Sequence, residues 1–156
     1  MPNKKDSLIS DLKSLIPGYG AYRAQESRRE DDRLTRNFLV KRIDECKSQL
    51  DSLGAQATRE GDLDTPLQIE KFRNDLDRAR SRLAGAVEGY SGWFSKRTVD
   101  EKLLEQVAQQ DSNLASVVDL IGSLIGQKPL ENQQLKETIE MLHQRIDRRG
   151  ELLKQL

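Results

Sequence analysis

The sequence is short of the residues that usually build metal centres and covalent cross-links. Among its 156 residues there is one cysteine, Cys46, and one histidine, His143. A single cysteine cannot form a disulfide within the chain, which excludes a disulfide scaffold and favours a reducing compartment. One cysteine and one histidine also cannot supply the nitrogen and sulfur ligands that a zinc site normally uses.

Long hydrophobic runs and an excess of one charge are missing as well. No apolar run approaches the ~18 residues of a membrane-spanning helix, and the N-terminal segment lacks the continuous apolar stretch of a signal peptide. The 26 basic and 26 acidic residues cancel. Affinity for nucleic acid depends largely on neutralised phosphates, so we do not expect a nucleic-acid partner. These absences predict a cytoplasmic protein.

The residues that are present indicate a thin core. Charged residues make up 33% of the chain, above the usual ~25%. Leu, Ile, Val and Phe together still account for about 25%, which is enough to exclude disorder. A thin core with charged flanks suits long helices, whose apolar face is only a stripe. β-Branched residues never alternate with polar ones, so we expect no strands.

Helical periodicity predicts a single all-α domain over residues 1–156. The five expected helices are 4–16, 21–53, 66–90, 99–126 and 130–155. In the long helices apolar residues recur at alternating spacings of three and four, the pattern of a coiled-coil seam. The cleanest run is Ile69, Phe72, Leu76, Ala79, Leu83, Ala86 and Tyr90. The second and third helices are therefore predicted to form a long antiparallel coiled-coil hairpin, on which an elongated bundle is built.

Local signals set the expected helix boundaries. Pro17 ends the first helix, and Gly54 is well placed to end the second. Thr65, followed by Pro66 and then Gln68, predicts a capping box at the start of the third helix. Thr98 and Glu101 predict a second capping box before the fourth helix.

Charged residues add two observations. Residues 22–42 carry seven basic and four acidic side chains, whereas residues 98–126 carry one lysine and five acidic ones. Opposite charge favours placing these two helices side by side. In the last helix, Arg149 occupies the one seam position that is not apolar.

Candidate catalytic and metal-binding residues do not form complete sites. Glu140 and His143 have the spacing of a di-iron ligand pair, but such a site needs a second pair and the chain has one histidine. Asp62 and Asp64 lack the further oxygen ligands of a calcium loop. Cys46 lies on the apolar seam and is predicted to be a small buried side chain. We therefore expect no enzyme, no cofactor, no metal and no small-molecule substrate.

A cluster of arginines is the best candidate for a nucleic-acid site. It comprises Arg28, Arg29, Arg33 and Arg36. These side chains alternate with Glu30, Asp31 and Asp32, which would repel phosphates. The preferred interpretation is a solvated helix face.

The aromatic residues are predicted to gather at one end of the hairpin. If the hairpin turns near position 59.5, residue i faces roughly residue 119 − i. The end remote from the turn then collects five of the seven aromatic residues: Tyr19, Tyr22, Tyr90, Trp93 and Phe94. This cluster is either a small end core or a patch that binds a partner protein, since tyrosine and tryptophan are enriched in interface hot spots.

The first helix carries an apolar stripe made of Leu8, Leu12, Leu15 and Ile16. The stripe could dock on the bundle, on a partner chain or on a lipid surface. Lys4, Lys5 and Lys13 favour an anionic membrane, whereas Asp6 and Asp11 oppose it.

Two segments together resemble a known group of sequences. They are Ile16-Pro17-Gly18-Tyr19-Gly20-Ala21-Tyr22-Arg23 and Gly89-Tyr90-Ser91-Gly92-Trp93-Phe94. The pair resembles an uncharacterised group of small bacterial all-helical proteins, which implies an all-helical fold and a bacterial origin. The order of a short amphipathic helix before a long hairpin is more loosely similar to phage-shock-type membrane-remodelling proteins.

These observations predict a non-enzymatic structural or protein-interaction bundle that binds a protein partner or associates with itself. The alternative is a peripheral membrane-associated stress or remodelling protein that uses its N-terminal helix.

Overall fold

The protein is built from helices in the part of the chain that the structure describes. This computed structural model describes residues 3–85 and 100–154. Its elements are α1 (Lys4–Leu15), the short 3-10 helix η1 (Gln25–Ser27), α2 (Arg28–Arg59), α3 (Asp64–Ala84), α5 (Glu101–Ile125) and α6 (Asn132–Lys154). No strand occurs within those two ranges. The predicted all-α class is confirmed.

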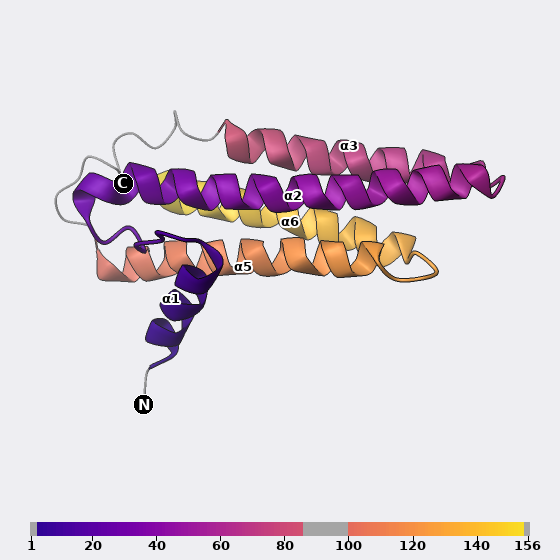
Figure 1. Ribbon diagram of the computed structural model, residues 1–156. Coiled ribbons are helices and arrows are strands. Elements are labelled where there is room, and N and C mark those ends of the chain that lie inside the picture. The colour runs from indigo at the N-terminus through magenta and orange to yellow at the C-terminus, as the bar shows by residue number, and fades with distance from the viewer. Residues whose placement is uncertain (1–2, 86–99, 155–156) are drawn as a thin grey trace.

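Four of the helices run lengthwise around a common core (Figure 1). α2 packs against α3 and α5, and α6 packs against the same two helices, so that α2 and α6 lie at opposite corners. The bundle thus consists of two antiparallel hairpins, α2–α3 and α5–α6, side by side. α1 lies outside the four-helix bundle and packs across α5, near the end of the bundle where α2 begins. None of the helices described is long and apolar enough to cross a membrane.

Two apolar clusters form the core. The larger one follows the four helices and contains the predicted seam residues Ile69, Phe72, Leu76, Ala79 and Leu83. The smaller one, which we call the end cluster, lies where α1 meets the bundle and joins Leu12 and Ile16 to Val107 of α5 and Leu152 of α6. The end cluster therefore holds α1 on the bundle.

The predicted second helix is displaced at both ends. It starts at Arg28 rather than at 21, because Ala21 and Tyr22 have positive φ angles of 54° and 62°, which no right-handed helix accommodates. It continues through Gly54 to Arg59, and the turn instead uses Gly61, with a φ of 80°. Glycine is the residue that adopts this left-handed conformation without strain.

The start of the third helix also differs from the prediction. α3 begins at Asp64, and the Oδ1 atom of Asp62 accepts hydrogen bonds of 3.0 Å from the backbone N–H groups of Asp64 and Thr65. The predicted capping box at Thr65 is therefore wrong, because Asp62 satisfies the first N–H groups instead. The predicted end of this helix, at 90, lies outside the described residues.

The longer α2 shifts the register of the hairpin. Lys47 forms an ion pair with Asp77 at 2.6 Å, whereas the predicted register places position 72 opposite it. Arg73 pairs with Asp51 and Arg80 with Asp44 in the same shifted register. The predicted antiparallel hairpin is thus confirmed, and its predicted register is wrong by five residues.

In the second half of the chain, the observed helix boundaries lie close to the predicted ones. α5 and α6 each begin two residues after the predicted start, and the carboxylate of Asp100 caps α5 by accepting the N–H of Lys102 at 3.0 Å. Thr98 of the predicted capping box lies outside the described residues. α2 and α5 lie side by side, as the opposite charges predict.

Two glycine substitutions test these boundaries. Gly54→Ala should raise the free energy of unfolding by about 1 kcal/mol, because alanine is the better helix former. A Cβ atom there would lie 3.6 Å from Ile69 Cγ2, an ordinary contact. Gly61→Ala should lower the free energy of unfolding by about 1 kcal/mol, because its φ is positive. Urea denaturation measures both, and the reverse order would show that α2 ends at Gly54.

Candidate functional site

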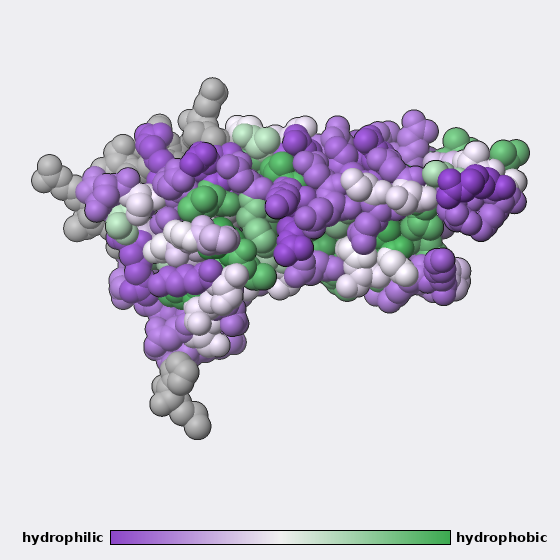
Figure 2. Space-filling model, viewed as in Figure 1, coloured by the Kyte–Doolittle hydropathy of each residue, from purple (hydrophilic) through white to green (hydrophobic). Residues whose placement is uncertain are grey.

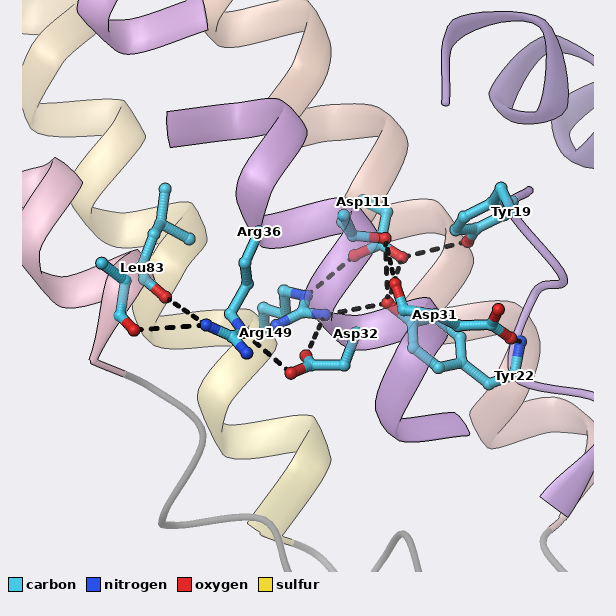
Figure 3. A network of polar contacts seen from close by, with 10 residues as sticks. Tyr19, Tyr22, Asp31, Asp32, Arg36, Leu83, Asp111 and Arg149 are labelled. Carbon is cyan, nitrogen blue, oxygen red and sulfur yellow. Dashed lines mark hydrogen bonds and ion pairs between the residues drawn. The ribbon is translucent and has the colours of Figure 1, made fainter. Parts of the chain in front are cut away.

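A buried layer of charged side chains separates the two apolar clusters. Asp32 and Arg36 of α2, Asp111 of α5 and Arg149 of α6 occupy positions that continue the apolar seams of their helices (Figure 3). All four are at most 4% exposed. Two carboxylates face two guanidinium groups, so the layer is neutral in formal charge.

Arg149 is at the centre of this layer. Its Nε atom donates to Asp111 Oδ1 at 2.8 Å, and its Nη2 atom donates to Asp32 Oδ1 at 2.7 Å and to the Tyr22 hydroxyl at 2.8 Å. One side chain of α6 thereby connects α2, α5 and the loop after α1 (Figure 3). Hydrogen bonds between charged groups are about twice as strong as neutral ones.

Arg36 extends the layer to α3, the remaining helix of the bundle. Its Nε atom donates to Asp32 Oδ2 at 2.8 Å, and its Nη1 atom donates to the carbonyl oxygens of Leu83 and Ala84 at 3.1 and 3.3 Å. These carbonyls belong to the last turn of α3, where no helical N–H group is left to bind them. A cation at a helix C-terminus also interacts favourably with the helix dipole. Arg36 therefore fixes the end of α3.

The loop between α1 and α2 is held by its tyrosines. The hydroxyl groups of Tyr19 and Tyr22 donate to Asp111 Oδ2 at 3.0 and 2.8 Å (Figure 3). The two rings meet edge to face, with centroids 6.0 Å apart. Both side chains are buried. Residues 3–24, which we call the N-terminal arm, are thereby fastened to α5.

The backbone of the same loop is also fixed. The Tyr22 N–H group donates to Asp31 Oδ2 at 3.0 Å, and Arg28 Nε donates to the Tyr22 carbonyl at 2.9 Å. A Cβ atom on Gly20 would lie 2.9 Å from Asp31 Oδ2, so only glycine lets the loop come this close. The positive φ angles of Ala21 and Tyr22 each cost about 1–3 kcal/mol. The polar contacts offset that strain and hold the arm in one conformation.

Burial shifts the pKa values of four groups in and beside the layer. Burial raises the pKa of Asp111, although Arg149 and the two tyrosine hydroxyls oppose this rise. Burial likewise raises the pKa of Asp31, against the N–H groups of Tyr22 and Gly20. Burial raises the pKa of Tyr19 and of Tyr22 well above the usual value for a phenol. Both tyrosines are therefore donors across the whole physiological pH range.

Chemically, the layer is closed. Each carboxylate oxygen of Asp32 and Asp111 accepts at least one hydrogen bond from an arginine or a tyrosine. Over residues 3–85 and 100–154, His, Cys, Asp and Glu side chains form no group of three or more that could hold a metal ion. The arrangement can fix the relative positions of helices and loop.

Two of the five residues of the predicted aromatic cluster lie in the part of the chain that the structure describes. Tyr19 and Tyr22 are in the core, at 2% and 0% exposure, so they belong to an end core and are not accessible to a partner. Tyr90, Trp93 and Phe94 lie outside the described residues, and their gathering with the first two stays a prediction.

The predicted stripe of the first helix is mostly covered. Leu12 and Ile16 are buried in the end cluster, Leu8 packs against it, and Leu15 remains 40% exposed. The stripe docks on the bundle, so a lipid surface could reach Leu12 and Ile16 only if α1 left it.

The interpretation of the arginines as a solvated face is wrong for half of them. Arg28 and Arg36 are buried with Asp31 and Asp32. The sequence carries a signal for this layer: stepping back from Leu39 of α2 by three and then four residues places Arg36 and Asp32 on the apolar seam. Asp111 likewise continues the seam of α5, as Arg149 visibly does in α6.

The two remaining candidates have structural contacts. Cys46 is buried as predicted, with its Sγ atom 3.8 Å from the Val118 carbonyl oxygen, and burial raises the pKa of its thiol to about 11. His143 Nε2 lies 3.1 Å from the carbonyl oxygen of Asp75 and connects α6 to α3.

Comparison of this chain with protein-family models, with curated proteins and with solved structures finds no match. The resemblance to small bacterial all-helical proteins therefore stays a prediction.

Replacing Arg149 should lower the stability of the folded chain. Arg149→Met leaves the carboxylate of Asp111 buried without its cation and should lower the free energy of unfolding by about 3–5 kcal/mol. Adding Asp111→Asn should recover at least about 1 kcal/mol, because the uncompensated charge is removed. Arg148→Met, at the exposed neighbouring position, is the matched control and should change little. Urea denaturation of the wild type and of these three variants measures the effects, and a double variant less stable than Arg149→Met would contradict the coupling.

Stability should also fall steeply in alkali. The unfolded chain ionises its tyrosines near pH 10, whereas burial keeps Tyr19 protonated in the folded state. The folded state then binds more protons, and stability declines as pH rises, by up to about 1.4 kcal/mol per pH unit for each such group. Tyr19→Phe should make this decline shallower between pH 10 and pH 11, as measured by urea denaturation. An unchanged slope would mean that Tyr19 ionises equally in both states.

Proposed function

We propose that this chain is a non-enzymatic structural and protein-interaction bundle, whose partners are other proteins, including further copies of itself. The observation that carries the proposal is the closed charge layer around Arg149. Its carboxylates and tyrosine hydroxyls are buried and bound to one another, which suits a structural role in the bundle.

The layer supports this role through the N-terminal arm. Tyr19 and Tyr22 fasten the arm to α5, while Asp31 and Arg28 fix the loop backbone. A segment held at so many points presents its outer surface in a fixed position. Binding then does not have to order the arm, and this saving in conformational entropy strengthens association.

The membrane alternative receives less support from the same contacts. The apolar stripe that would enter a lipid surface is used to dock α1 on the bundle, where Leu12 and Ile16 are buried. Membrane binding would first have to undo these contacts.

Cross-linking in the native host tests the proposal. A lysine-reactive reagent, followed by purification of the tagged chain under denaturing conditions, should yield discrete adducts with protein. Arg148→Met should retain them, whereas Arg149→Met, which loosens the arm, should lose at least about 80% per molecule of chain. The proposal is overturned if the wild-type chain gives no adduct above an untagged control, or if Arg149→Met leaves the adducts unchanged.

A further inference from the structure

The turn between α2 and α3 exposes two large apolar side chains. Leu63 is 80% exposed and Leu67 is 62% exposed, more than any other large apolar residue among those described. They are four residues apart at the start of α3, so they lie on one face. We call this feature the tip. Figure 2 shows hydrophobic side chains at the surface of this end of the hairpin.

The tip is acidic around its leucines. Three carboxylates, on Glu60, Asp62 and Asp64, stand against the single guanidinium of Arg59. All four residues are exposed. The tip is therefore an apolar knob with a net negative rim.

A groove lined by five apolar and four polar residues lies along the N-terminal half of α2 and its middle. Its volume is about 440 Å³, and one wall comes from the end of α1 and the following loop, with Leu15, Ile16 and Pro17. The opposite wall comes from α2, with Leu34 and Phe38. Figure 2 shows hydrophobic side chains in the hollow between the end of α1 and α2. Hollows of roughly 300–1,000 Å³ hold drug-sized ligands, so this one has room for two leucine side chains.

The rim of the groove is basic. Lys41 and Arg42 line it together with one acid, Glu45. Arg42 lies over the Phe38 ring, 5.3 Å from its centroid, which keeps its charge beside the apolar floor. The groove thus matches the tip in both respects: apolar floor to apolar knob, and positive rim to negative rim.

The two surfaces cannot meet within one molecule. Leu34 and Phe38 of the groove lie 25 and 21 residues before Arg59, the last residue of α2, which at ~1.5 Å per residue is at least about 30 Å along a continuous helix. We propose that the tip of one copy docks in the groove of the next, with Leu63 and Leu67 against Leu34 and Phe38 and with Asp64 facing Lys41. This inference rests on the proposed function and names a second copy of the chain as the partner.

The geometry determines the type of assembly. A contact between two different surfaces of identical chains is heterologous, and it continues into a ring or an open filament instead of stopping at a dimer. The leucines involved make a small interface, which is typical of transient association. Association should therefore appear in the micromolar to millimolar range as a series of growing species.

Sedimentation velocity of the purified chain over that range, with circular dichroism to verify folding, tests the proposal. The tip variant Leu63→Asp/Leu67→Asp and the groove variant Leu15→Asp/Lys41→Glu should each weaken association at least tenfold. A mixture of the two variants has one intact tip and one intact groove, and it should form dimers that grow no further. Leu120→Asp is the matched control, because Leu120 is 42% exposed on α5 and belongs neither to the tip nor to the groove lining.

A charge exchange tests the predicted pairing. Asp64→Lys alone and Lys41→Glu alone should each weaken association, by about three- to tenfold, and both effects should shrink in high salt. A chain that carries both changes should associate nearly as the wild type does, since each contact again joins opposite charges.

Three results would overturn the proposal: a wild-type chain that stays monomeric at millimolar concentration, a mixture that grows beyond dimers, or a Leu120→Asp chain weakened as much as the tip variant. The third result would place the contact on α5. Self-association and cross-linking in the host are separate measurements. A monomeric chain that still gives protein adducts in the host removes the second copy as partner and leaves the proposed function standing.

Discussion

Much of the structure depends on one guanidinium group. Arg149 reaches the carboxylates of Asp32 and Asp111 and the hydroxyl of Tyr22, so a single side chain ties together α2, α5, α6 and the loop after α1. Arg36 shares Asp32 and carries the connection to the end of α3. One layer of polar contacts therefore positions all four helices of the bundle and the arm.

Burying such a layer of charges contributes little net free energy to the stability of the core. Removing two carboxylates and two guanidinium groups from water costs several kcal/mol for each ion, and packed apolar side chains of similar volume are often as stable or more so. Apolar packing is non-directional, so it selects one arrangement of the helices and the loop less strictly than hydrogen bonds between charged groups do. The polar contacts of Arg149 and Asp111 with Tyr22 are made by one particular loop conformation, in which Ala21 and Tyr22 have positive φ angles. We attribute the layer to positional specificity rather than to stability.

The sequence predicted the helices because their apolar periodicity is a local property. α5 and α6 begin within two residues of the expected positions, and the seam of α3 is buried as expected. The boundaries of α2 were harder, since Gly54 and Gly61 both fit a helix end in the sequence, and the positive φ angle of Gly61 is visible only in the structure. The fold class was thus predictable, and the register of the hairpin was not.

The charge layer was only partly visible in the sequence. Arg149 stands out because its neighbours on the seam are all apolar. Asp32 and Arg36 continue the seam of Leu39, but they stand in a run of charged residues, in which a buried residue and a solvated one have the same letter. Their polar partners are Arg149 and the carbonyl groups at the end of α3, which are far away in the chain. No local pattern encodes contacts of this kind.

The layer and the surface groove are mechanically connected. One wall of the groove is the end of α1 with its following loop, and the other wall is α2. The width of the groove is therefore set by where the arm lies on the bundle, and the arm is positioned by Tyr19, Tyr22 and the end cluster. A surface formed partly by a loop is ordinarily mobile. Here the buried contacts of that loop give the groove the fixed shape of a surface built on helices, which is the condition under which a small interface can still be specific.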